Sequence, residues 1–172
     1  RPVKVLNVFA YTGGATLAAA AAGAQVTHVD ASKGMVSWAK ENAVSSGLKD
    51  APIRWLVDDC VKFVEREIRR GNTYDAIIMD PPSYGRGPKG EIWKIEDMIH
   101  PLIRLCTKIL SEDALFFLVN SYTTGLAPAV LTYMISTELR PWNGTVDSQE
   151  IGLPVTESGL VLPCGASGRW FR

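Results

Sequence analysis

The stretch that decides the fold is residues 74–84, which read YDAIIMDPPSY. Its centre, Ala76 to Met79, is an unbroken apolar run, which is typical of a strand covered on both faces. The run ends at Asp80, followed by two prolines. Proline has a fixed φ and no backbone N–H, so this turn is stiff and presents carbonyl oxygens beside a carboxylate. The segment predicts a central strand with a polar turn at its carboxyl end.

Outward from this strand, short β-rich runs alternate with helix-length segments. The expected strands are Val3 to Phe9, Gln25 to Asp30, Ile53 to Val57, Tyr74 to Met79 and Ala114 to Val119. The expected helices are Thr16 to Ala22, Lys33 to Ser46, Cys60 to Arg70, Trp93 to Leu110 with a kink or break at Pro101, and Pro128 to Ser136. Strands that are each followed by a helix predict a Rossmann-like, doubly wound α/β fold, with a mostly parallel sheet and helices on both faces.

The alternation of predicted strands and helices ends after Glu138. Thr145 to Leu153, Gly159 to Leu162 and Ser167 to Phe171 look like strands joined by turns without a helix between them. We therefore expect a C-terminal antiparallel hairpin at one edge of the sheet. No linker or repeat divides residues 1–172, so we expect a single domain. Because the chain runs from Arg1 straight into an apolar strand, we expect a fragment that lacks an N-terminal domain.

Composition narrows the class of protein. The 172 residues are 47% hydrophobic and 21% charged, which is globular composition. Lys plus Arg and Asp plus Glu both number 18, and this balance weighs against tight binding of a phosphate backbone by this chain alone. No apolar run approaches the length of a membrane span. Three scattered cysteines and two histidines form no zinc or disulfide pattern. We expect a cytoplasmic protein with no metal and no membrane partner.

Open parallel sheets bind ligands at the carboxyl ends of their strands, so the residues just after each strand are the candidates. The first group is Tyr11, Thr12 and Gly13, followed by a second glycine. Glycines let the backbone turn tightly and approach a ligand, and the next helix directs N–H groups toward it. The glycines could equally serve only the turn. The spacing is not GxGxxG, which disfavours a dinucleotide cofactor.

Two acidic positions follow the next strands. Asp30 ends the second strand, where a carboxylate can accept hydrogen bonds from both ribose hydroxyls of an adenosine group. The alternative is a helix N-cap, although Ser32 can fill that role. Asp58 and Asp59 follow the third strand; one can accept from the amine of adenine while the other caps a helix. We prefer Asp59 for the ligand.

The fourth candidate is the turn Asp80-Pro81-Pro82-Ser83-Tyr84. It suits a planar substrate that carries an amine. Asp80 and the Pro81 carbonyl would accept hydrogen bonds, and the Tyr84 ring would stack on the substrate. The alternative is a proline-rich turn with Tyr84 packed in the core. A glycine-rich loop, Gly85 to Gly90, follows, and it either closes over the substrate or is only a solvated connection.

These pieces together resemble the class I S-adenosylmethionine-dependent methyltransferases. The matching segments are NVFAYTGGATL (7–17), VTHVDAS (26–32), VDDCVKFV (57–64) and YDAIIMDPPSY (74–84). In this order they are most similar to the bacterial 23S ribosomal RNA methyltransferases that act on cytosine C5 or guanine N7. The resemblance covers about residues 3–119 and implies N-terminal RNA-binding modules in the longer protein.

The resemblance also implies roles for the candidate residues, with S-adenosylmethionine as cofactor. Tyr11, Thr12 and Gly13 would lie along its methionine part, Asp30 on the ribose and Asp59 on the adenine. The catalytic group that lines the acceptor pocket would consist of Asp80, Pro81 and Tyr84.

The cysteines bear on the acceptor atom. Methylation of cytosine C5 needs a cysteine thiolate that first adds to the base, and the family carries it after the fourth or fifth strand. Here those positions hold Ser83 and Asn120-Ser121, while Cys164 falls in the hairpin. We therefore predict direct in-line transfer to a nitrogen of an RNA base. Alternatives are a protein-amide or small-molecule methyltransferase, a catalytically inactive cofactor-binding module, and a nicotinamide-dependent dehydrogenase.

Overall fold

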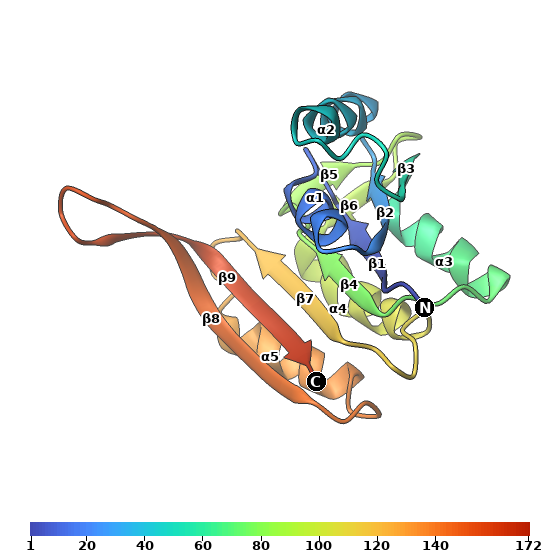
Figure 1. Cartoon of the computed structure of the whole chain (residues 1–172). Coiled ribbons are helices and arrows are strands. Elements are labelled where there is room, and N and C mark those ends of the chain that lie inside the picture. Colours follow the sequence, from blue (N-terminus) through green and yellow to red (C-terminus); the bar gives the residue numbers. More distant parts are fainter.

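A computed structural model describes all 172 residues, and its centre is a seven-stranded sheet with the order β3-β2-β1-β4-β7-β9-β8 (Figure 1). The five parallel strands are β1 (Lys4–Val8), β2 (Gln25–Asp30), β3 (Ile53–Val57), β4 (Ala76–Met79) and β7 (Phe116–Ser121). The remaining two, β8 (Thr145–Pro154) and β9 (Val161–Phe171), form an antiparallel hairpin beside β7. The predicted mostly parallel sheet with a terminal hairpin is confirmed.

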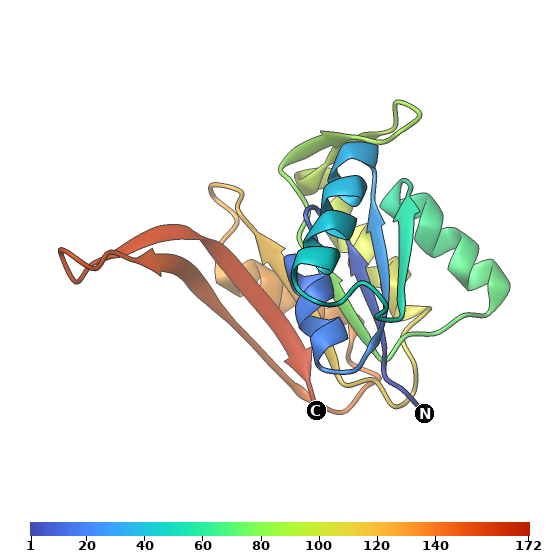
Figure 2. The same ribbon diagram turned by 45° about the horizontal axis from the view of Figure 1, so that its top comes forward.

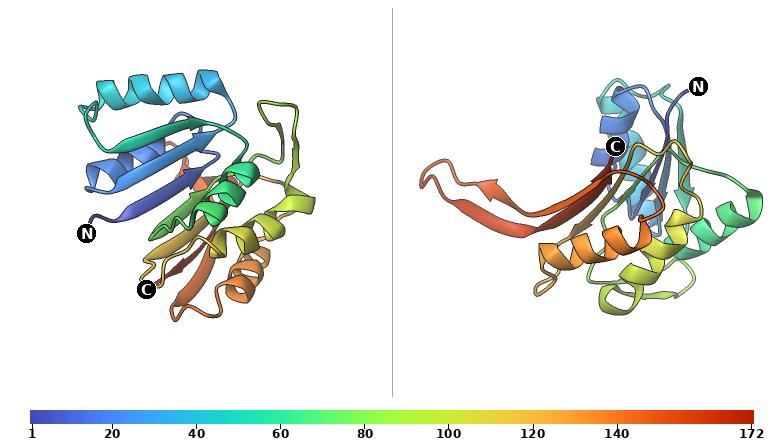
Figure 3. Two further views of the ribbon diagram at one scale, coloured as in Figure 1. Left: turned by 90° about the vertical axis from the view of Figure 1, so that its right-hand side faces the viewer. Right: turned by 90° about the horizontal axis from the view of Figure 1, so that it is seen from below.

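Helices cover both faces of the sheet (Figure 3, left). One face carries α1 (Gly14–Ala21) and α2 (Lys33–Ser45); the other carries α3 (Cys60–Arg70), α4 (Ile95–Thr107) and α5 (Pro128–Glu138). The α3–α5 side contains the main core, a cluster of 26 buried residues. Six small or β-branched residues form the core under α1, whose sequence GATLAAAA lets the helix lie close to the sheet.

The strand order fixes where a ligand site can form. The chain winds outward from β1 through β2 to β3 and then returns to the other side of β1 with β4. All four residues of β4 are buried, as the apolar run predicts. At this reversal the helices leave in opposite directions, which opens a crevice at the carboxyl ends of β1 and β4. The turns after β1, β2 and β4 therefore meet at one edge.

Two local expectations need correction. The segment Gly85 to Gly90 begins in a strand and continues as the turn of a hairpin, because β5 (Tyr84–Arg86) and β6 (Ile92–Lys94) pair in antiparallel fashion. The helix expected over residues 93–110 with a break is α4, which runs without interruption through Pro101. Pro101 is exposed, so the carbonyl that loses its N–H partner can bond to water instead.

The C-terminal hairpin is longer than its sequence pattern predicts. The two segments expected at 159–162 and 167–171 merge into β9, and its pairing with β8 shifts register between Ile151 and Gly152 of β8. Ile151 pairs with Gly165 and Gly152 with Pro163, so Cys164 is the extra residue of a β-bulge. The far end of the hairpin projects well beyond the body of the molecule (Figures 1 and 2). No helix in the structure has both the length and the apolar content of a membrane span.

Candidate active site

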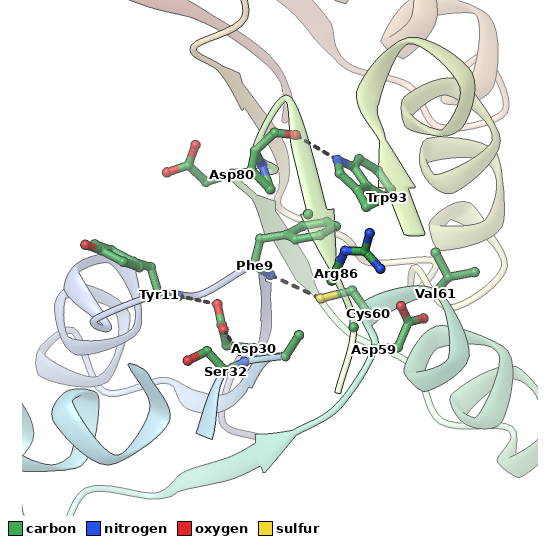
Figure 4. A pocket seen from close by; sticks show the side chains of 14 residues that line it. Phe9, Tyr11, Asp30, Ser32, Asp59, Cys60, Val61, Asp80, Arg86 and Trp93 are labelled. Atoms are coloured by element: carbon green, nitrogen blue, oxygen red, sulfur yellow. Dashed lines mark hydrogen bonds between the residues drawn. The ribbon is translucent and has the colours of Figure 1, made fainter. Parts of the chain in front are cut away.

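A cavity of about 310 Å³ opens at the carboxyl edge of the sheet, at the reversal between β1 and β4 (Figure 4). Its walls come from the turns after β1, β2, β3 and β4 and from the β5–β6 hairpin. The lining residues include four acidic or aromatic candidates from the sequence, namely Tyr11, Asp30, Asp59 and Asp80. Asp30 and Asp80 therefore face one common space.

Asp30 is held by backbone N–H groups at the end of β2. One carboxylate oxygen accepts from the Tyr11 N–H at 2.9 Å and the other from the Ser32 N–H at 2.8 Å. Ser32 caps α2, with its side chain accepting from Met35, so Asp30 is free of the capping role. Each carboxylate oxygen can accept more than one hydrogen bond, and Asp30 lines the cavity. The two backbone N–H groups thus fix the orientation of the Asp30 carboxylate at the edge of the cavity.

The turn after β1 is folded tightly by unusual backbone angles. Phe9 and Tyr11 both have positive φ, 53° and 49°, which is uncommon for residues with a side chain. Such backbone strain is found preferentially at ligand sites. Gly13 follows with φ 88° and caps α1, and a Cβ there would lie 3.1 Å from the Ala39 Cβ. The glycine therefore allows α1 and α2 to pack closely behind the turn.

The third strand contributes Asp59 and the residues that follow it. Asp59 lines the cavity and also caps α3, because its Oδ1 accepts from the Lys62 N–H at 2.9 Å. Asp59 is thus the helix cap of the aspartate pair, and it is also the member of the pair that lines the cavity. Asp58 instead forms an ion pair with Arg66 on the outside of α3. The Cys60 thiol faces inward and accepts from the Phe9 N–H.

Asp80 is the most perturbed acid in the cavity. Its Oδ1 is buried and has no hydrogen-bond partner within the chain. Burial raises the pKa of this carboxyl group from its ordinary value of 3.8 to about 6, since the charged form loses hydration. Figure 4 shows the carboxylate directed away from Phe9. An acceptor that is buried, unpaired and still largely ionised at neutral pH is suited to receive a hydrogen bond from a ligand.

An aromatic wall closes the cavity opposite Asp30 (Figure 4). The rings of Phe9 and Trp93 pack with centroids 4.7 Å apart. The Trp93 indole N–H donates to the Pro82 carbonyl at 2.7 Å, which ties the β5–β6 hairpin to the acidic turn. Arg86 and its two glycine neighbours complete this wall. The hairpin predicted as a loop is therefore a structured cover over one end of the cavity.

Four predicted residues lie outside the lining of this cavity. Thr12 accepts from the Asn42 side chain through its carbonyl, and Gly13 is buried behind the turn. Pro81 is buried, and its neighbour Pro82 lines the cavity instead. Tyr84 is the first residue of β5 and is 50% exposed.

Sequence reasoning did not select Phe9 and Trp93 for the site, and it considered Arg86 only as part of the glycine-rich loop that could close over the substrate. Phe9 ends the first predicted strand, so the same positional rule that selected Asp30 would have found it.

A second group of polar residues adjoins Asp80 on the side of β7. Tyr122 follows β7 directly, and burial together with the nearby Asp80 and Cys164 raises the pKa of its hydroxyl. The Ser83 and Thr123 hydroxyls meet at 2.7 Å and join the acidic turn to the segment after β7. Cys164 lies beside Tyr122 because Ala166 of β9 pairs with Ser121 at the end of β7.

The other cysteines are unsuited to chemistry. Cys60 and Cys106 are fully buried, and burial raises the pKa of both thiols far above neutrality. A thiol that does not ionise is not a nucleophile. No group of three or more His, Cys, Asp or Glu side chains is arranged to hold a metal ion.

Comparison with known proteins gives the family. Residues 2–138 match the family model described as S-adenosylmethionine-dependent methyltransferase. The chain is 36% identical over 108 residues to the ribosomal RNA large subunit methyltransferase K/L of Shewanella frigidimarina, covering 59% of this chain and 15% of that protein. It is 31% identical over 120 residues to the ribosomal RNA large subunit methyltransferase K of Neisseria meningitidis, covering 69% of this chain and 34% of that protein.

Solved structures agree with this assignment. A SAM-dependent methyltransferase from Agrobacterium tumefaciens superposes with a TM-score of 0.95 at 44% identity, over 99% of this chain and 56% of that one. SMU.776, solved in complex with SAH, superposes with a TM-score of 0.77 at 25% identity, over 97% of this chain and 44% of that one. The chain thus spans only part of each relative. With the family model matching most of its length, the chain belongs to the S-adenosylmethionine-dependent methyltransferases.

Proposed function

We propose that this chain binds S-adenosylmethionine in the cavity between Asp30 and Asp80 and transfers its methyl group to a nitrogen of an RNA base, with ribosomal RNA as the substrate. The observation that carries the proposal is the geometry of the two acids. Asp30 is fixed by two backbone N–H groups, whereas Asp80 has a buried oxygen without a partner. One acid is organised for the cofactor and the other is open to an acceptor.

The lining residues fit the cofactor part by part. The fixed Asp30 carboxylate suits the two ribose hydroxyls, which are hydrogen-bond donors. Asp59 suits the amine of adenine, and the Phe9 ring gives a flat apolar surface for the base. Tyr11 belongs to the turn that leads into α1, whose N-terminal N–H groups favour a carboxylate. Thr12 and Gly13 would contribute through the shape of this turn rather than through their side chains.

The chain's own contribution to the chemistry is alignment and electrostatics. The bound cofactor supplies an activated methyl group on a positively charged sulfur. Asp80 accepts an N–H of the acceptor base, which orients the nitrogen and stabilises positive charge as it develops there. The Pro81 carbonyl is a second acceptor on the same stiff turn. Tyr84 lies at the rim of the hairpin, where its half-exposed ring can contact the substrate outside the cavity.

Ribosomal RNA is the proposed substrate because two relatives are named as ribosomal RNA large subunit methyltransferases. The zero net charge of this chain is consistent with a longer protein in which another domain supplies most of the RNA affinity. Residues 1–172 would then be its catalytic domain, working in the cytoplasm. Protein amides and small molecules remain the alternative acceptors, since Asp-Pro-Pro turns suit planar amines in general.

One observation favours a second acceptor atom. Cys164 sits in a β-bulge next to Tyr122, on the Asp80 side of β7, and is the only cysteine that is not fully buried. A thiolate there could add to a pyrimidine ring and activate a carbon for methylation. We prefer nitrogen because the Cys164 thiol donates to the backbone carbonyl of Leu162 and not to a side chain that could act as a general base.

The test is transfer of a labelled methyl group from S-adenosylmethionine to ribosomal RNA, followed by mass spectrometry of the digested nucleosides. We expect a labelled base methylated on nitrogen, and no label when Asp80 is replaced by asparagine. Label on carbon that disappears in Cys164→Ala would favour the second acceptor. Label only on protein, or none in any fraction, would contradict the RNA proposal. A rise in melting temperature with S-adenosylmethionine but not with NAD would distinguish a methyltransferase from a nicotinamide-dependent dehydrogenase.

A further inference from the structure

The β5–β6 hairpin is attached to the rest of the chain at both of its ends. At its base, the Trp93 indole N–H donates to the Pro82 carbonyl at 2.7 Å (Figure 4). At its turn, the Glu91 carboxylate forms an ion pair with the Lys62 ammonium of α3, with 2.5 Å between nitrogen and oxygen. The hairpin therefore spans the distance from the turn after β4 to the first turn of α3.

Glu91 shapes the turn of the hairpin with both its backbone and its side chain. Its carbonyl accepts from the Gly87 N–H at 2.7 Å, and its Oε2 accepts from the Lys89 N–H at 2.9 Å. The Glu91 side chain is only 16% exposed, and the hydrogen bond from Lys62 holds its pKa at about 2, well below the ordinary value. The carboxylate is therefore charged at neutral pH, and it joins the turn to α3 as well as shaping it.

The ion pair is the only polar contact by which residues 85–92 reach another element of the chain. Every other hydrogen bond of these residues lies within the hairpin. Segments that have few contacts with the body of a protein are the ones that open locally. The Lys62–Glu91 pair is therefore the polar contact that opposes opening of the hairpin away from α3.

The position of Lys62 in α3 is not explained by the helix itself. Lys62 is the third helical residue; Asp59 is the N-cap, and the first turn contains no acidic residue. The N-terminal end of a helix carries a partial positive charge, so a lysine in the first turn is unfavourable there. Glu91 supplies a negative charge from outside the helix. The lysine is thus accounted for by its partner on the hairpin.

The walls that this ion pair holds together belong to the cavity. Arg86 and Gly87 line the cavity from the hairpin, whereas Asp59 and Val61 line it from the start of α3. Lys62 follows Val61 directly, yet neither member of the ion pair is a lining residue. Separating the two walls would widen the cavity at the end where Asp59 lies. The ion pair therefore acts on the cavity from outside it.

We propose that Lys62 and Glu91 are positioning residues for S-adenosylmethionine, and that their ion pair controls how fast the cofactor enters and leaves. The inference rests on the proposed placement of adenine beside Asp59. The pair joins two parts of the chain and does not line the cavity, so weakening it makes opening equally easier for entry and for release. Both rate constants should therefore rise together, while the dissociation constant, which is their ratio, stays nearly the same.

The test is stopped-flow measurement of S-adenosylmethionine association and dissociation with the 172-residue chain. Glu91→Gln removes the charge but keeps an acceptor for the Lys89 N–H, and Lys62→Met removes the ammonium at similar length. Each substitution should raise both rate constants about two- to fivefold, as expected for one ion pair near the surface, and change the dissociation constant less than about twofold. The double variant should exchange cofactor no faster than the single variants, because all three lack the same contact.

The matched control is Asp147→Asn, which breaks the exposed ion pair between Asp147 and Arg169 on the β8–β9 hairpin. This variant should leave both rate constants unchanged. Hydrogen exchange of the chain without cofactor gives a second readout. The backbone amides of residues 85–92 should exchange about two- to fivefold faster in Glu91→Gln than in wild type, whereas those of β4 should not change.

Four results would each overturn this inference alone: unchanged hydrogen exchange in residues 85–92, faster release without faster association, single effects that multiply in the double variant, or faster cofactor exchange in the control. Failure of wild type to bind S-adenosylmethionine would overturn the proposed function, and this inference with it. The two failures are therefore distinguishable.

Discussion

Replacing Asp80 by asparagine should make the protein more stable while abolishing methyl transfer. The reasoning starts from burial, which raises the pKa of Asp80 to about 6 in the folded chain, against about 3.8 for an exposed aspartate. Between these values the folded state binds more protons than the unfolded state. The free energy of unfolding contributed by this group therefore falls as pH rises from about 4 to about 6, and stays low above that.

The size of the effect follows from the pKa difference. A displacement of about two pH units corresponds to about 3 kcal/mol, since each unit is about 1.4 kcal/mol. Asp80 is only partly buried, so solvent screening reduces this to roughly 1–2 kcal/mol. Asparagine has nearly the same shape but no charge to desolvate. At pH 8 the variant should therefore melt roughly 2–8 °C above wild type for a chain of this size.

The assay is thermal unfolding by calorimetry at several pH values, with labelled transfer measured in parallel. The gain in melting temperature should shrink toward zero near pH 4, where wild-type Asp80 is also neutral. Transfer at pH 8 should fall at least about 100-fold, whereas cofactor affinity should change little. The control is Asp50→Asn at an exposed position, which should alter neither property. Equal melting temperatures of wild type and Asp80→Asn at pH 8, or retained transfer, would refute the reasoning.

Three further predictions concern the cavity and its surroundings. Asp30→Ala should weaken S-adenosylmethionine binding by about 10- to 100-fold in calorimetry, because hydrogen bonds to a carboxylate contribute about 1.5–3 kcal/mol each; unchanged affinity would remove Asp30 from the site. Gly13→Ala should lower the free energy of unfolding by roughly 1–3 kcal/mol in denaturant titrations, given its φ of 88° and the Ala39 contact, and an unaffected midpoint would count against this. Cys164→Ser should leave transfer rates within about twofold if nitrogen is the acceptor, and a loss of about 100-fold or more would indicate carbon.

The rule that ligand-binding residues lie at the carboxyl ends of parallel strands succeeded for residues whose position depends on the backbone alone. Asp30 is the last residue of β2 and Asp80 directly follows β4, and parallel strands bring their carboxyl ends to one edge of the sheet. The two acids therefore share a cavity, as expected. Asp59 could be selected by the same rule, although only the structure shows that it lines the cavity and caps α3 together.

The rule failed where side-chain direction depends on pairing that the sequence does not reveal. Gly85 pairs with Trp93 across the β5–β6 hairpin, and both residues line the cavity. Tyr84 pairs with Lys94, and this neighbouring pair points to the other side because side chains alternate along a strand. The sequence analysis treated this segment as a loop, and a loop has no regular alternation from which the direction of its side chains could be predicted. Tyr84 was thus chosen as the aromatic residue that stacks on the acceptor, whereas Trp93 is the aromatic residue of this hairpin that lines the cavity.

The direction of the last strand explains why the sequence analysis did not select Cys164 as a candidate nucleophile. Residues at the carboxyl edge follow a parallel strand, but an antiparallel strand reaches that edge at its beginning. Ser121 ends β7 and pairs with Ala166, so the residues just before Ala166 lie at the ligand edge. The bulge then frees Cys164 from the ladder beside Tyr122. A search for a nucleophile in this fold must therefore include the residues of the last strand that precede its pairing with β7, and the Cys164→Ser variant tests whether Cys164 serves as one.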